Sequence, residues 1–413
     1  MSLREGKKVL LIEPFSTGHH MALYLRHIVQ ELAYKKAQVM LLTTEEAYGD
    51  AAYQLVQNEL PSSAQVFFFK TAPQAANCCK ILLLKSQITN WIKLRKAVQK
   101  ISFHNSIDII YVPTVDWIVK AVELLGSPFG HLPFSALFIS PKHHRFACGI
   151  GSRRWSNFIY EQLFQRLLNI PTLNRLLVID ETFYEFAKNR YGRRSAKIAF
   201  APDFGSVGRR VDRLTARRRL NISFKSKVVL VYGGLSRKKG IEELLYAMER
   251  ESELGQAVIL LAGRPSEGMR RLLQKPNVVR LLQQKRLVPQ LHFHDSDDQD
   301  EVFAAADVVW VAYTGGSYGS SGVLHQAVGY GLPVIAGETG LVGMLVKRFN
   351  LGATVDPRKP SEVAEAILYL LSGRPMMGDV QGNLAAFRYK YSAREHVSAV
   401  ADALEASSTR QTI

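Results

Sequence analysis

Two serines and a glycine stand at the start of a predicted helix in the C-terminal half of the chain. The stretch from Tyr318 to Gly340 reads YGSSGVLHQAVGYGLPVIAGETG. Ser320 or Ser321 can cap the helix that runs through GVLHQAV, which leaves free backbone N–H groups and two hydroxyls at the end of the preceding strand. Such a helix start binds anions. A plain helix cap explains the serines as well, so this loop alone is only a candidate anion site.

A second candidate anion site precedes the first in the chain. The apolar run VVLVY is followed by GGLSRKKGIEELL. Gly233 and Gly234 allow the backbone to turn close to a ligand. Arg237, Lys238 and Lys239 place cations where the next helix begins, although the helix dipole disfavours cations there. A solvated basic loop is the alternative, but two anion sites in one domain together indicate a diphosphate.

Titratable residues follow predicted strands in the N-terminal half. The loop Thr17–His20 separates a strand from a helical pattern, Asp116 follows DIIYVPTV, and His143 and His144 follow FISPK. Imidazole transfers protons near neutral pH, and carboxylates also act as bases. We therefore predict catalytic roles for His19, Asp116 and His143. A plain polar helix start is an equally good interpretation of His19.

These residues need a scaffold of parallel strands, and the apolar pattern supplies one. Short apolar runs alternate with helical patterns, as expected for buried parallel strands. The runs of the first half are KVLLIEPF, AQVMLLTT, DIIYVP, FSALFIS and NRLLVID. The pattern restarts with KVVLVYGG, QAVILLAGR, ADVVWVAY, PVIAGE and ATVDP. The predicted fold class is therefore α/β, with two Rossmann-like doubly wound parallel-sheet domains facing each other across a cleft.

The chain length and composition predict where these domains meet. A chain of 413 residues suits two domains. Segment 202–227 is rich in Gly, Arg and Lys and lacks apolar periodicity, which predicts a linker. We expect an N-terminal domain over 1–201 and a C-terminal domain over 202–385. A C-terminal helix over 386–413 is expected to pack back toward the N-terminal domain.

A formal net charge of +17 would attract nucleic acid, nucleotides or an anionic membrane. The segment KILLLKSQITNWIKLRKAVQK contains no acidic residue. In a helix, Lys85, Lys93, Lys96 and Lys100 share one side and Trp91 lies among apolar residues on the other. We predict that these five residues contact an anionic membrane, although a surface helix that covers its own core explains the pattern as well. Known nucleic-acid-binding patterns are absent, so no nucleic acid partner is expected.

Other motifs exclude disulfide frameworks, metal sites and dinucleotide-binding sites. Cys78, Cys79 and Cys148 form neither a disulfide framework nor a spaced metal quartet. The four aspartates between Asp295 and Asp300 precede a helix, where acids are the usual capping pattern, so no metal site is predicted. TGGSYGSSG lacks the spacing of a dinucleotide-binding motif. Neither a signal-peptide pattern nor an apolar run of about 18 residues is present, so a cytoplasmic location, which includes the inner face of the membrane, is expected.

From about residue 174 to about residue 371 the chain resembles the nucleotide-sugar half of glycosyltransferases with the two-domain GT-B fold, most closely those of family 4. The matching segments are VIDETFYEFAKNRYG, KIAFAPDFG, YGGLSRKKGIEELLYAM, VILLAGR, FAAADVVWVAY and GYGLPVIAGETG. The resemblance implies transfer of a sugar from a nucleotide-sugar, such as a UDP-sugar or GDP-sugar, to an acceptor hydroxyl. It further implies retention of stereochemistry, no metal, no cofactor, and a sugar or lipid-linked acceptor in bacterial cell-surface polysaccharide or glycolipid assembly.

The resemblance also assigns residues to the donor. It implies that Lys239 binds the diphosphate and that the backbone of Ser320, Ser321 and Gly322 holds the phosphates. The other expected diphosphate contacts are Gly18, Gly233, Gly234 and Arg237. The expected nucleoside contacts are Arg264, Phe293 and Gln326.

This chain departs from the family pattern at several positions. Gly234 stands where family 4 has an arginine, and Tyr318 and Gln326 stand in place of its two spaced glutamates. Met344 lies near the position of a further glutamate. Gln326 can still hydrogen-bond a ribose, but Tyr318 cannot replace a carboxylate. The chain therefore looks like a divergent branch with an SSGV motif.

Three alternatives stay open at this stage. His19 is similar in position to the histidine base of inverting plant-type GT-B enzymes, so inversion competes with retention. A nucleotide-sugar epimerase on the same fold is a second alternative. A non-catalytic GT-B subunit that binds a nucleotide-sugar is the third, which the missing glutamates favour and the retained Lys239 disfavours.

Overall fold

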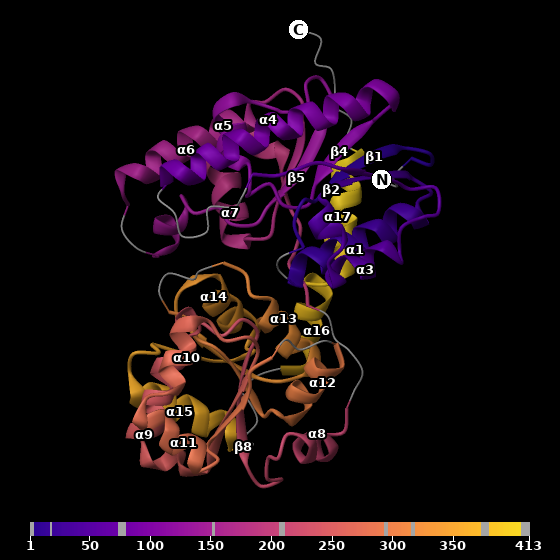
Figure 1. The fold of residues 1–413 in the computed structure, drawn as a ribbon. Coiled ribbons are helices and arrows are strands. Elements are labelled where there is room, and N and C mark those ends of the chain that lie inside the picture. The colour runs from indigo at the N-terminus through magenta and orange to yellow at the C-terminus, as the bar shows by residue number, and fades with distance from the viewer. Residues whose placement is uncertain are drawn as a thin grey trace. The chain divides into compact units, whose positions relative to one another are not determined.

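The chain forms two compact α/β units (Figure 1). The computed structural model describes residues 4–16, 19–72, 80–150, 153–205, 211–292, 296–314, 319–372 and 380–405. The first unit comprises Met1–Pro202 and Ala393–Ile413, and the second comprises Asp203–Ser392. Each unit contains one parallel sheet with helices around it. The predicted fold class of two Rossmann-like parallel-sheet domains is confirmed.

The sheet of the first unit has the order β3-β2-β1-β4-β5-β6-β7 among the described residues, and its strands all run parallel. The order reverses between β1 and β4, which is the doubly wound pattern. The strands are β1 (Lys8–Ile12), β2 (Gln38–Thr43), β3 (Gln65–Phe68), β4 (Ile109–Val112), β5 (Phe134–Phe138), β6 (Leu173–Val178) and β7 (Ile198–Phe200).

Helices cover both faces of this sheet. Their bounds are α1 (His19–Tyr34), α2 (Glu45–Tyr48), α3 (Ala51–Gln57), α4 (Lys80–His104), α5 (Val119–Leu125), α6 (Trp155–Leu168), α7 (Glu181–Arg190) and α17 (Ala393–Glu405), with short 3-10 turns at Arg145–Cys148 and Gly192–Lys197. Crossovers between parallel strands are right-handed, and so α1 lies on one face while α4, α5 and α6 lie on the other. Figure 1 shows α4, α5 and α6 side by side.

The C-terminal helix α17 belongs to the first unit. The carbonyl oxygen of Ala403 accepts hydrogen bonds from Oγ of Ser135 at 2.8 Å and Nδ2 of Asn174 at 2.7 Å. The His396 ring stacks on the Tyr24 ring of α1 with 4.6 Å between centroids. These buried contacts attach residues from the end of the chain to a sheet formed from its first half.

The sheet of the second unit has the order β10-β9-β8-β11-β12-β13 among the described residues, again all parallel. The strands are β8 (Lys227–Tyr232), β9 (Ala257–Ala262), β10 (Leu287–Gln290), β11 (Val308–Val311), β12 (Val334–Gly337) and β13 (Gly352–Val355). The helices are α8 (Arg213–Arg219), α9 (Ile241–Arg250), α10 (Glu267–Leu273), α11 (Pro276–Gln283), α12 (Ser296–Ala305), α13 (Gly322–Tyr330), α14 (Gly340–Phe349), α15 (Pro360–Leu371) and α16 (Val380–Lys390). Here the order reverses between β8 and β11.

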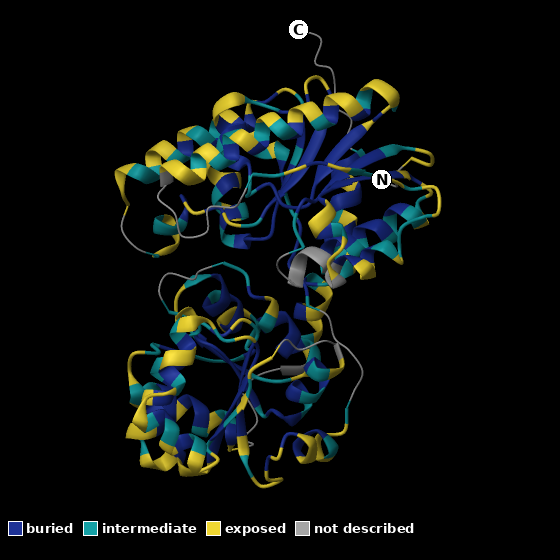
Figure 2. Cartoon of the chain, viewed as in Figure 1, coloured by how far each residue is buried: buried dark blue, intermediate teal, exposed yellow. Residues whose placement is uncertain are grey.

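Each unit has its own apolar core, formed by the central strands and the inner sides of the helices (Figure 2). β1, β4, β8, β9 and β11 are almost completely buried, which matches their continuous apolar sequences. Burial of each Leu, Ile or Val side chain contributes about 1.5–3 kcal/mol to folding. This burial fixes the strand ends from which the candidate site is built.

The segment predicted as a linker is folded onto the second unit. Asp212 caps α8 within this segment, and Arg217 of α8 is 1% exposed. The Arg217 guanidinium pairs with Asp307 at 2.8 Å and donates to the carbonyl oxygens of Ala305, Phe224 and Ser226. Residues 211–227 of this segment thus pack in the second unit, where a run of basic residues includes one arginine whose donors are used inside the protein.

Candidate active site

The candidate site of the second unit lies at the carboxyl ends of β8 and β11, where the strand order reverses. Ligands in doubly wound sheets bind at this position. Gly233 follows β8 with φ +93°, and Gly263 follows β9 with φ +141°. A Cβ on Gly263 would lie 1.9 Å from the carbonyl oxygen of Gly233, so these two backbones touch and only glycine fits. The glycine at 263 thus permits close packing of the two loops, while Gly233 adopts the positive φ of its turn.

Lys239 is held at the centre of this loop. Its Nζ donates to the carbonyl oxygen of Tyr232 at 2.6 Å and lies 5.3 Å from the centroid of the Tyr313 ring. Burial lowers the pKa of Lys239 to about 8. Within the described part of the chain no carboxylate forms a salt bridge with this ammonium group. A partly buried cation without an acidic partner is suited to an anionic ligand.

The backbone of Lys239 is fixed against β11. Its carbonyl oxygen accepts from Nε1 of Trp310 at 2.9 Å, and the carbonyl of Lys238 accepts from the N–H of Thr314 at 2.8 Å. Gly240 caps α9 with φ +65°, and a Cβ there would lie 2.3 Å from the carbonyl oxygen of Ala312. The loop after β8 and the end of β11 therefore form one rigid element.

Arg237 differs from Lys239 in its surroundings. Its side chain is exposed and its Nη2 lies 3.5 Å from the carboxylate of Glu242 in the first turn of α9. Glu242 also pairs with Lys275 at 2.6 Å. This acidic residue compensates for cations near the start of α9, so Arg237 does not need an anion to relieve the dipole.

Ser321 caps α13, as one interpretation of the sequence proposed. Its Oγ accepts from the N–H of Leu324 and lies 2.6 Å from the hydroxyl oxygen of Tyr313. Gly322 is exposed, and a Cβ there would have no atom within 4 Å, so the first turn of α13 opens to solvent. Gly233 lies between Lys239 and α13, since its Cβ direction meets Nζ of Lys239 at 3.4 Å and Cγ2 of Val323 at 3.8 Å. The structure thus brings Gly233, Lys239 and the start of α13 together.

The hydroxyl of Ser320 is hydrogen-bonded within the protein. Its Oγ donates to Oδ2 of Asp203 at 2.5 Å and lies 3.3 Å from Nε2 of His325. His325 is buried, and its ring stacks on Phe387 of α16. The sequence analysis missed Asp203 and His325 because no motif marks a loop carboxylate and a mid-helix histidine as neighbours. Their contacts fix the SSGV loop, which leaves its backbone rather than the Ser320 side chain for a ligand.

Gln326 is a core residue of α13. It is 3% exposed, and its Nε2 donates to Oε1 of Gln299 at 2.9 Å. Gln299 in turn bonds with the hydroxyls of Tyr232 and Tyr330. This buried network favours a structural role for Gln326 over the nucleoside contact that we expected.

Of the other two expected nucleoside residues, the structure describes Arg264 but not Phe293. Arg264 follows β9 and is exposed, and its carbonyl oxygen accepts from the N–H of Leu235 at 2.9 Å. Phe293 and Tyr318 lie outside the described residues, as do Asp295 of the aspartate cluster and the cysteines Cys78 and Cys79.

Two of the predicted catalytic residues of the first unit have structural contacts. Both carboxylate oxygens of Asp116 accept backbone N–H groups, from Ile139 and Ser140, at 2.9 Å each. Burial raises the pKa of Asp116 to about 6 despite these bonds. His143 is 5% exposed and lies among the rings of Phe164, Phe183 and Phe186, with its Nε2 2.7 Å from the hydroxyl of Tyr191.

Burial lowers the pKa of His143 to about 3, so the ring is neutral at physiological pH. The neighbouring His144 is also buried, with Nε2 3.0 Å from Oγ1 of Thr182 and 3.4 Å from Asp180. These surroundings favour core roles for both histidines, and a loop-anchoring role for Asp116, over catalysis. His19 begins α1, but Thr17 and Gly18 lie outside the described residues and nothing is established for the side chains of His19 and His20.

Glu13 is a buried acid at the end of β1 that the sequence analysis missed. Its Oε1 accepts from the N–H of Phe15 at 3.2 Å, and its carbonyl oxygen accepts from the hydroxyl of Tyr53 at 2.6 Å. Burial raises the pKa of Glu13 to about 8. Glu13 therefore anchors, in its neutral form, the loop that leads from β1 toward His19. Its position after KVLLI was the only available signal.

The helix expected to contact a membrane, α4, presents fewer basic residues to solvent than its pattern suggested. Lys85, Lys96 and Lys100 are exposed, whereas Nζ of Lys93 donates to the carbonyl oxygen of Thr71 at 3.3 Å. Trp91 packs against the core, and its Nε1 donates to the carbonyl oxygen of Gly126 at 2.8 Å. These contacts favour structural roles for Trp91 and Lys93 over the membrane contacts that we expected. Within the described residues no helix is long and apolar enough to cross a membrane.

The described aspartates of the acidic cluster lie in α12. Asp298 lies 3.3 Å from the His292 ring, and buried Asp300 accepts from the hydroxyl of Tyr330. Among the described residues no group of three or more His, Cys, Asp or Glu side chains is arranged to hold a metal ion.

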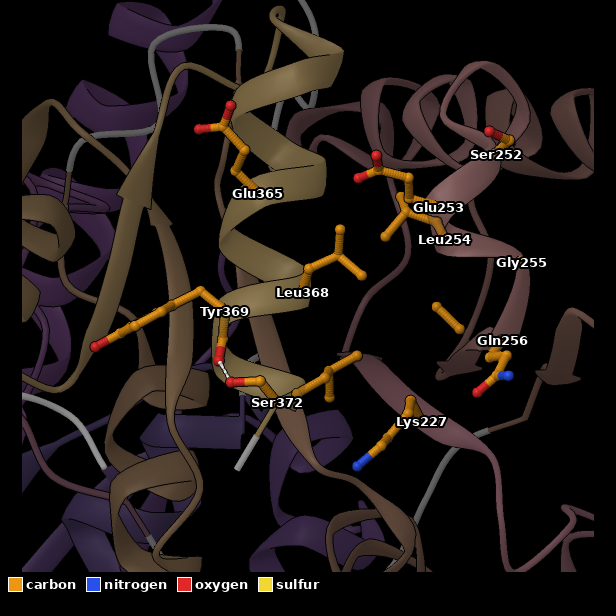
Figure 3. Close-up of a pocket in the computed structure, with 12 residues that line it drawn as sticks. Lys227, Ser252, Glu253, Leu254, Gly255, Gln256, Glu365, Leu368, Tyr369 and Ser372 are labelled. Atoms are coloured by element: carbon orange, nitrogen blue, oxygen red, sulfur yellow. Dashed lines mark hydrogen bonds between the residues drawn. The ribbon is translucent and has the colours of Figure 1, made fainter. Parts of the chain in front are cut away.

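A cavity of about 800 Å³ lies elsewhere in the second unit (Figure 3). It lies between α15 and the short turn Ser252–Gln256, at the amino ends of β8 and β9. Lys227, Glu253, Glu365 and Tyr369 are among its lining residues. Because the candidate site lies at the opposite, carboxyl ends of the strands, none of the predicted site residues lines this cavity.

Comparisons with known proteins agree with this arrangement. Residues 226–373 match the family model described as glycosyl transferases group 1. D-inositol 3-phosphate glycosyltransferase of Corynebacterium jeikeium is 29% identical over 262 residues, which is 61% of this chain and 60% of that protein. The chain thus matches about three fifths of the length of this curated relative.

Solved structures resemble the chain over nearly its full length. Sucrose-phosphate synthase from Thermosynechococcus elongatus aligns with a TM-score of 0.66 and 18% identity, covering 95% of this chain and 96% of that one. Anabaena HepE, solved in complex with UDP and glucose, aligns with a TM-score of 0.67 and 19% identity, covering 97% and 100%. At this identity the likeness establishes the fold. Together with the family match, these comparisons support a glycosyltransferase with the GT-B fold.

Proposed function

We propose that the chain transfers a sugar from a nucleotide-sugar donor to an acceptor hydroxyl, and that the donor diphosphate binds between Lys239 and the start of α13. The observation that carries this proposal is the Lys239 ammonium group, partly buried and without a described carboxylate partner, beside Gly233 and the open first turn of α13. A cation and free helix N–H groups converge on one point, which suits two adjacent phosphates.

The chemistry follows from the charge that must be stabilised. The bond between the anomeric carbon and the diphosphate oxygen breaks, the acceptor oxygen bonds to that carbon, and the acceptor proton passes to the leaving diphosphate oxygen. Negative charge grows on the leaving diphosphate, where Lys239 and the N–H groups of α13 are already oriented toward it. Arg237, Gly234 and Arg264 are exposed on the same loops and complete the proposed donor contacts.

The finer parts of the proposal rest on the family resemblance. We infer transfer without a metal, and retention rather than inversion, because retaining transfer needs no separate base when the acceptor proton passes to the leaving diphosphate. The acceptor is proposed to be a sugar or a lipid-linked molecule at the inner face of the membrane, in assembly of a cell-surface polysaccharide or glycolipid.

Incubation of the purified chain with UDP-sugars and GDP-sugars tests the proposal. The panel should include UDP-glucose, with which the similar Anabaena HepE was solved, and, as one acceptor, inositol 3-phosphate, because a similar protein is a D-inositol 3-phosphate glycosyltransferase. Acceptor-dependent release of nucleoside diphosphate is expected. Formation of an epimer without acceptor would instead indicate an epimerase, and tight donor binding without any product would indicate a non-catalytic subunit.

A further inference from the structure

Six apolar side chains are exposed on the first turns of α4 and α6 in the first unit. They are Ile81, Leu82, Leu83, Trp155, Phe158 and Ile159, and we call them the α4–α6 patch. Trp155 is 78% exposed and Ile81 is 67% exposed. The Trp155 and Phe158 rings lie 6.2 Å apart and form one apolar surface. Clustered exposed apolar side chains of this kind mark interaction surfaces.

Contacts through α5 place the two first turns near each other. Oε1 of Gln87, in the second turn of α4, accepts from the N–H of Lys120 in α5 at 2.8 Å. Nζ of the same Lys120 lies 4.8 Å from the centroid of the Tyr160 ring, in the second turn of α6. Because α4 and α6 each lead into a parallel strand of one sheet, both helices start at the same edge of that sheet. Ile81–Leu83 and Trp155–Ile159 therefore flank Lys120 on either side.

The exposed charges next to the α4–α6 patch are basic, whereas Glu123, which pairs with Lys120 at 2.7 Å, is buried. Residues 60–107 and 124–160, which include all of α4 and the start of α6, contain neither Asp nor Glu. Lys85, Arg153 and Arg154 are exposed next to the apolar side chains. Tryptophan and aliphatic side chains rimmed by arginine and lysine match the interface of an anionic bilayer, where rings sit at the headgroup level.

We propose that the α4–α6 patch inserts into the surface of an anionic lipid bilayer, with Trp155 and Phe158 as its anchors. This surface differs from the lysine-rich side of α4 considered from the sequence, because its apolar part comes from both helices and excludes the core residue Trp91. The proposal holds whether or not the chain transfers a sugar. Attachment combines apolar insertion with attraction to charged headgroups, so added salt should weaken it only in part.

The test is sedimentation of the full chain with vesicles of phosphatidylcholine, with and without phosphatidylglycerol. Binding to the anionic vesicles and a blue shift of tryptophan emission are expected, because Trp155 is the most exposed tryptophan among the described residues. The double variant Trp155→Ser, Phe158→Ser should bind anionic vesicles about tenfold more weakly or worse. Arg153→Gln with Arg154→Gln should reduce the preference for phosphatidylglycerol while retaining the blue shift.

A matched control comes from the other face of the sheet. Tyr34 at the end of α1 and Leu55 in α3 are exposed apolar residues of the same unit. The variant Tyr34→Ser, Leu55→Ser should bind vesicles as the unchanged chain does, and all variants should keep their thermal unfolding midpoint. The proposal is overturned if the unchanged chain ignores anionic vesicles, or if the Trp155 variant binds them equally. It is also overturned if light scattering shows a dimer that the Trp155 variant dissociates, since a second copy would then cover the patch.

Discussion

The hydroxyl oxygen of Tyr313 lies 2.6 Å from Oγ of Ser321. The ring of the same tyrosine lies 5.3 Å from Nζ of Lys239, so one side chain joins the cation to the helix cap. Tyr313 lies two residues after the end of β11 and is partly buried, and this burial raises its pKa to about 12. The neutral hydroxyl therefore keeps Ser321 and Lys239 in a fixed relation before any ligand binds.

Replacement of Tyr313 by phenylalanine tests this relation. Tyr313→Phe keeps the ring beside Lys239 and removes the bond to Ser321. We expect the affinity for a nucleoside diphosphate to fall by about 1 kcal/mol, or roughly fivefold, as for the loss of one neutral hydrogen bond. Titration calorimetry with UDP and GDP measures it. Tyr246→Phe, which removes an exposed hydroxyl bonded to Arg250, is the control and should leave the affinity unchanged.

Removal of the cation or the cap should weaken binding of the donor and of its nucleoside diphosphate product together. Lys239→Ala and Ser321→Ala should each cost about 1.5–3 kcal/mol of binding free energy, the range for charge-assisted contacts. Lys238→Ala, at an exposed neighbour, and Ser266→Ala, which removes the cap of α10, are matched controls. Unchanged product affinity in both site variants would remove the diphosphate assignment.

The lowered pKa of Lys239 predicts a pH dependence of binding. The ammonium form binds the diphosphate, so affinity should be constant below about pH 7 and fall as the pH rises through about 8. Lys239→Arg should show no such fall, because guanidinium stays protonated to a pH above about 12. Binding is measured rather than turnover, since Glu13 of the first unit also has a pKa of about 8 and its ionisation would affect the same range. A wild-type affinity that does not change between about pH 7 and pH 9 would contradict this account.

Chelation should leave activity intact once a donor and an acceptor are known. Lys239 and the N–H groups of α13 already neutralise the leaving diphosphate in the proposed site. Excess EDTA should therefore not reduce turnover. Loss of turnover that manganese or magnesium restores would instead point to the aspartates of α12.

The sequence predicted the fold well where burial is two-sided. β8 and β9 are buried along nearly their whole length, and VVLVY and VILLA were recognised as strands for this reason. The edge strands β3 and β10 were not predicted, because each is only partly buried and its sequence, QVFF or LVPQ, carries a weak apolar signal. Glycine, serine and lysine in loops after strands likewise pointed to the two loops that meet at the candidate site.

Contacts between distant residues could not be predicted in the same way. The bond between Ser320 and Asp203 joins residues 117 positions apart, and the amide of Gln326 is used by Gln299 of another helix. Sequence gives the position of a residue along an element but not its partner. Trp91 was therefore expected to contact a membrane although it packs against the core, and His143 was expected to be catalytic although it is buried. Periodicity predicts elements, whereas side-chain function depends on the packing between them.

The exposed lysines of α4 should add a salt-dependent part to any membrane attachment. Lys85, Lys96 and Lys100 are exposed within a stretch of 16 residues of one helix, and Figure 2 shows exposed residues along its outer side. Each lysine near an anionic surface contributes about 1 kcal/mol, which salt screens within a Debye length of about 10 Å. The triple change to glutamine should therefore weaken binding to phosphatidylglycerol vesicles at low salt and have little effect at high salt. Lys93 is left unchanged because it binds the backbone of Thr71.

A variant of equal net charge separates position from overall charge. Lys188, Lys285 and Lys347 are exposed on other helices and loops, and their change to glutamine removes the same charge. If this control loses as much vesicle binding as the α4 variant, the attraction comes from the net charge of the chain and not from α4. Nucleoside diphosphate affinity should be equal in both variants, because Lys239 and Ser321 belong to the second unit and keep their contacts.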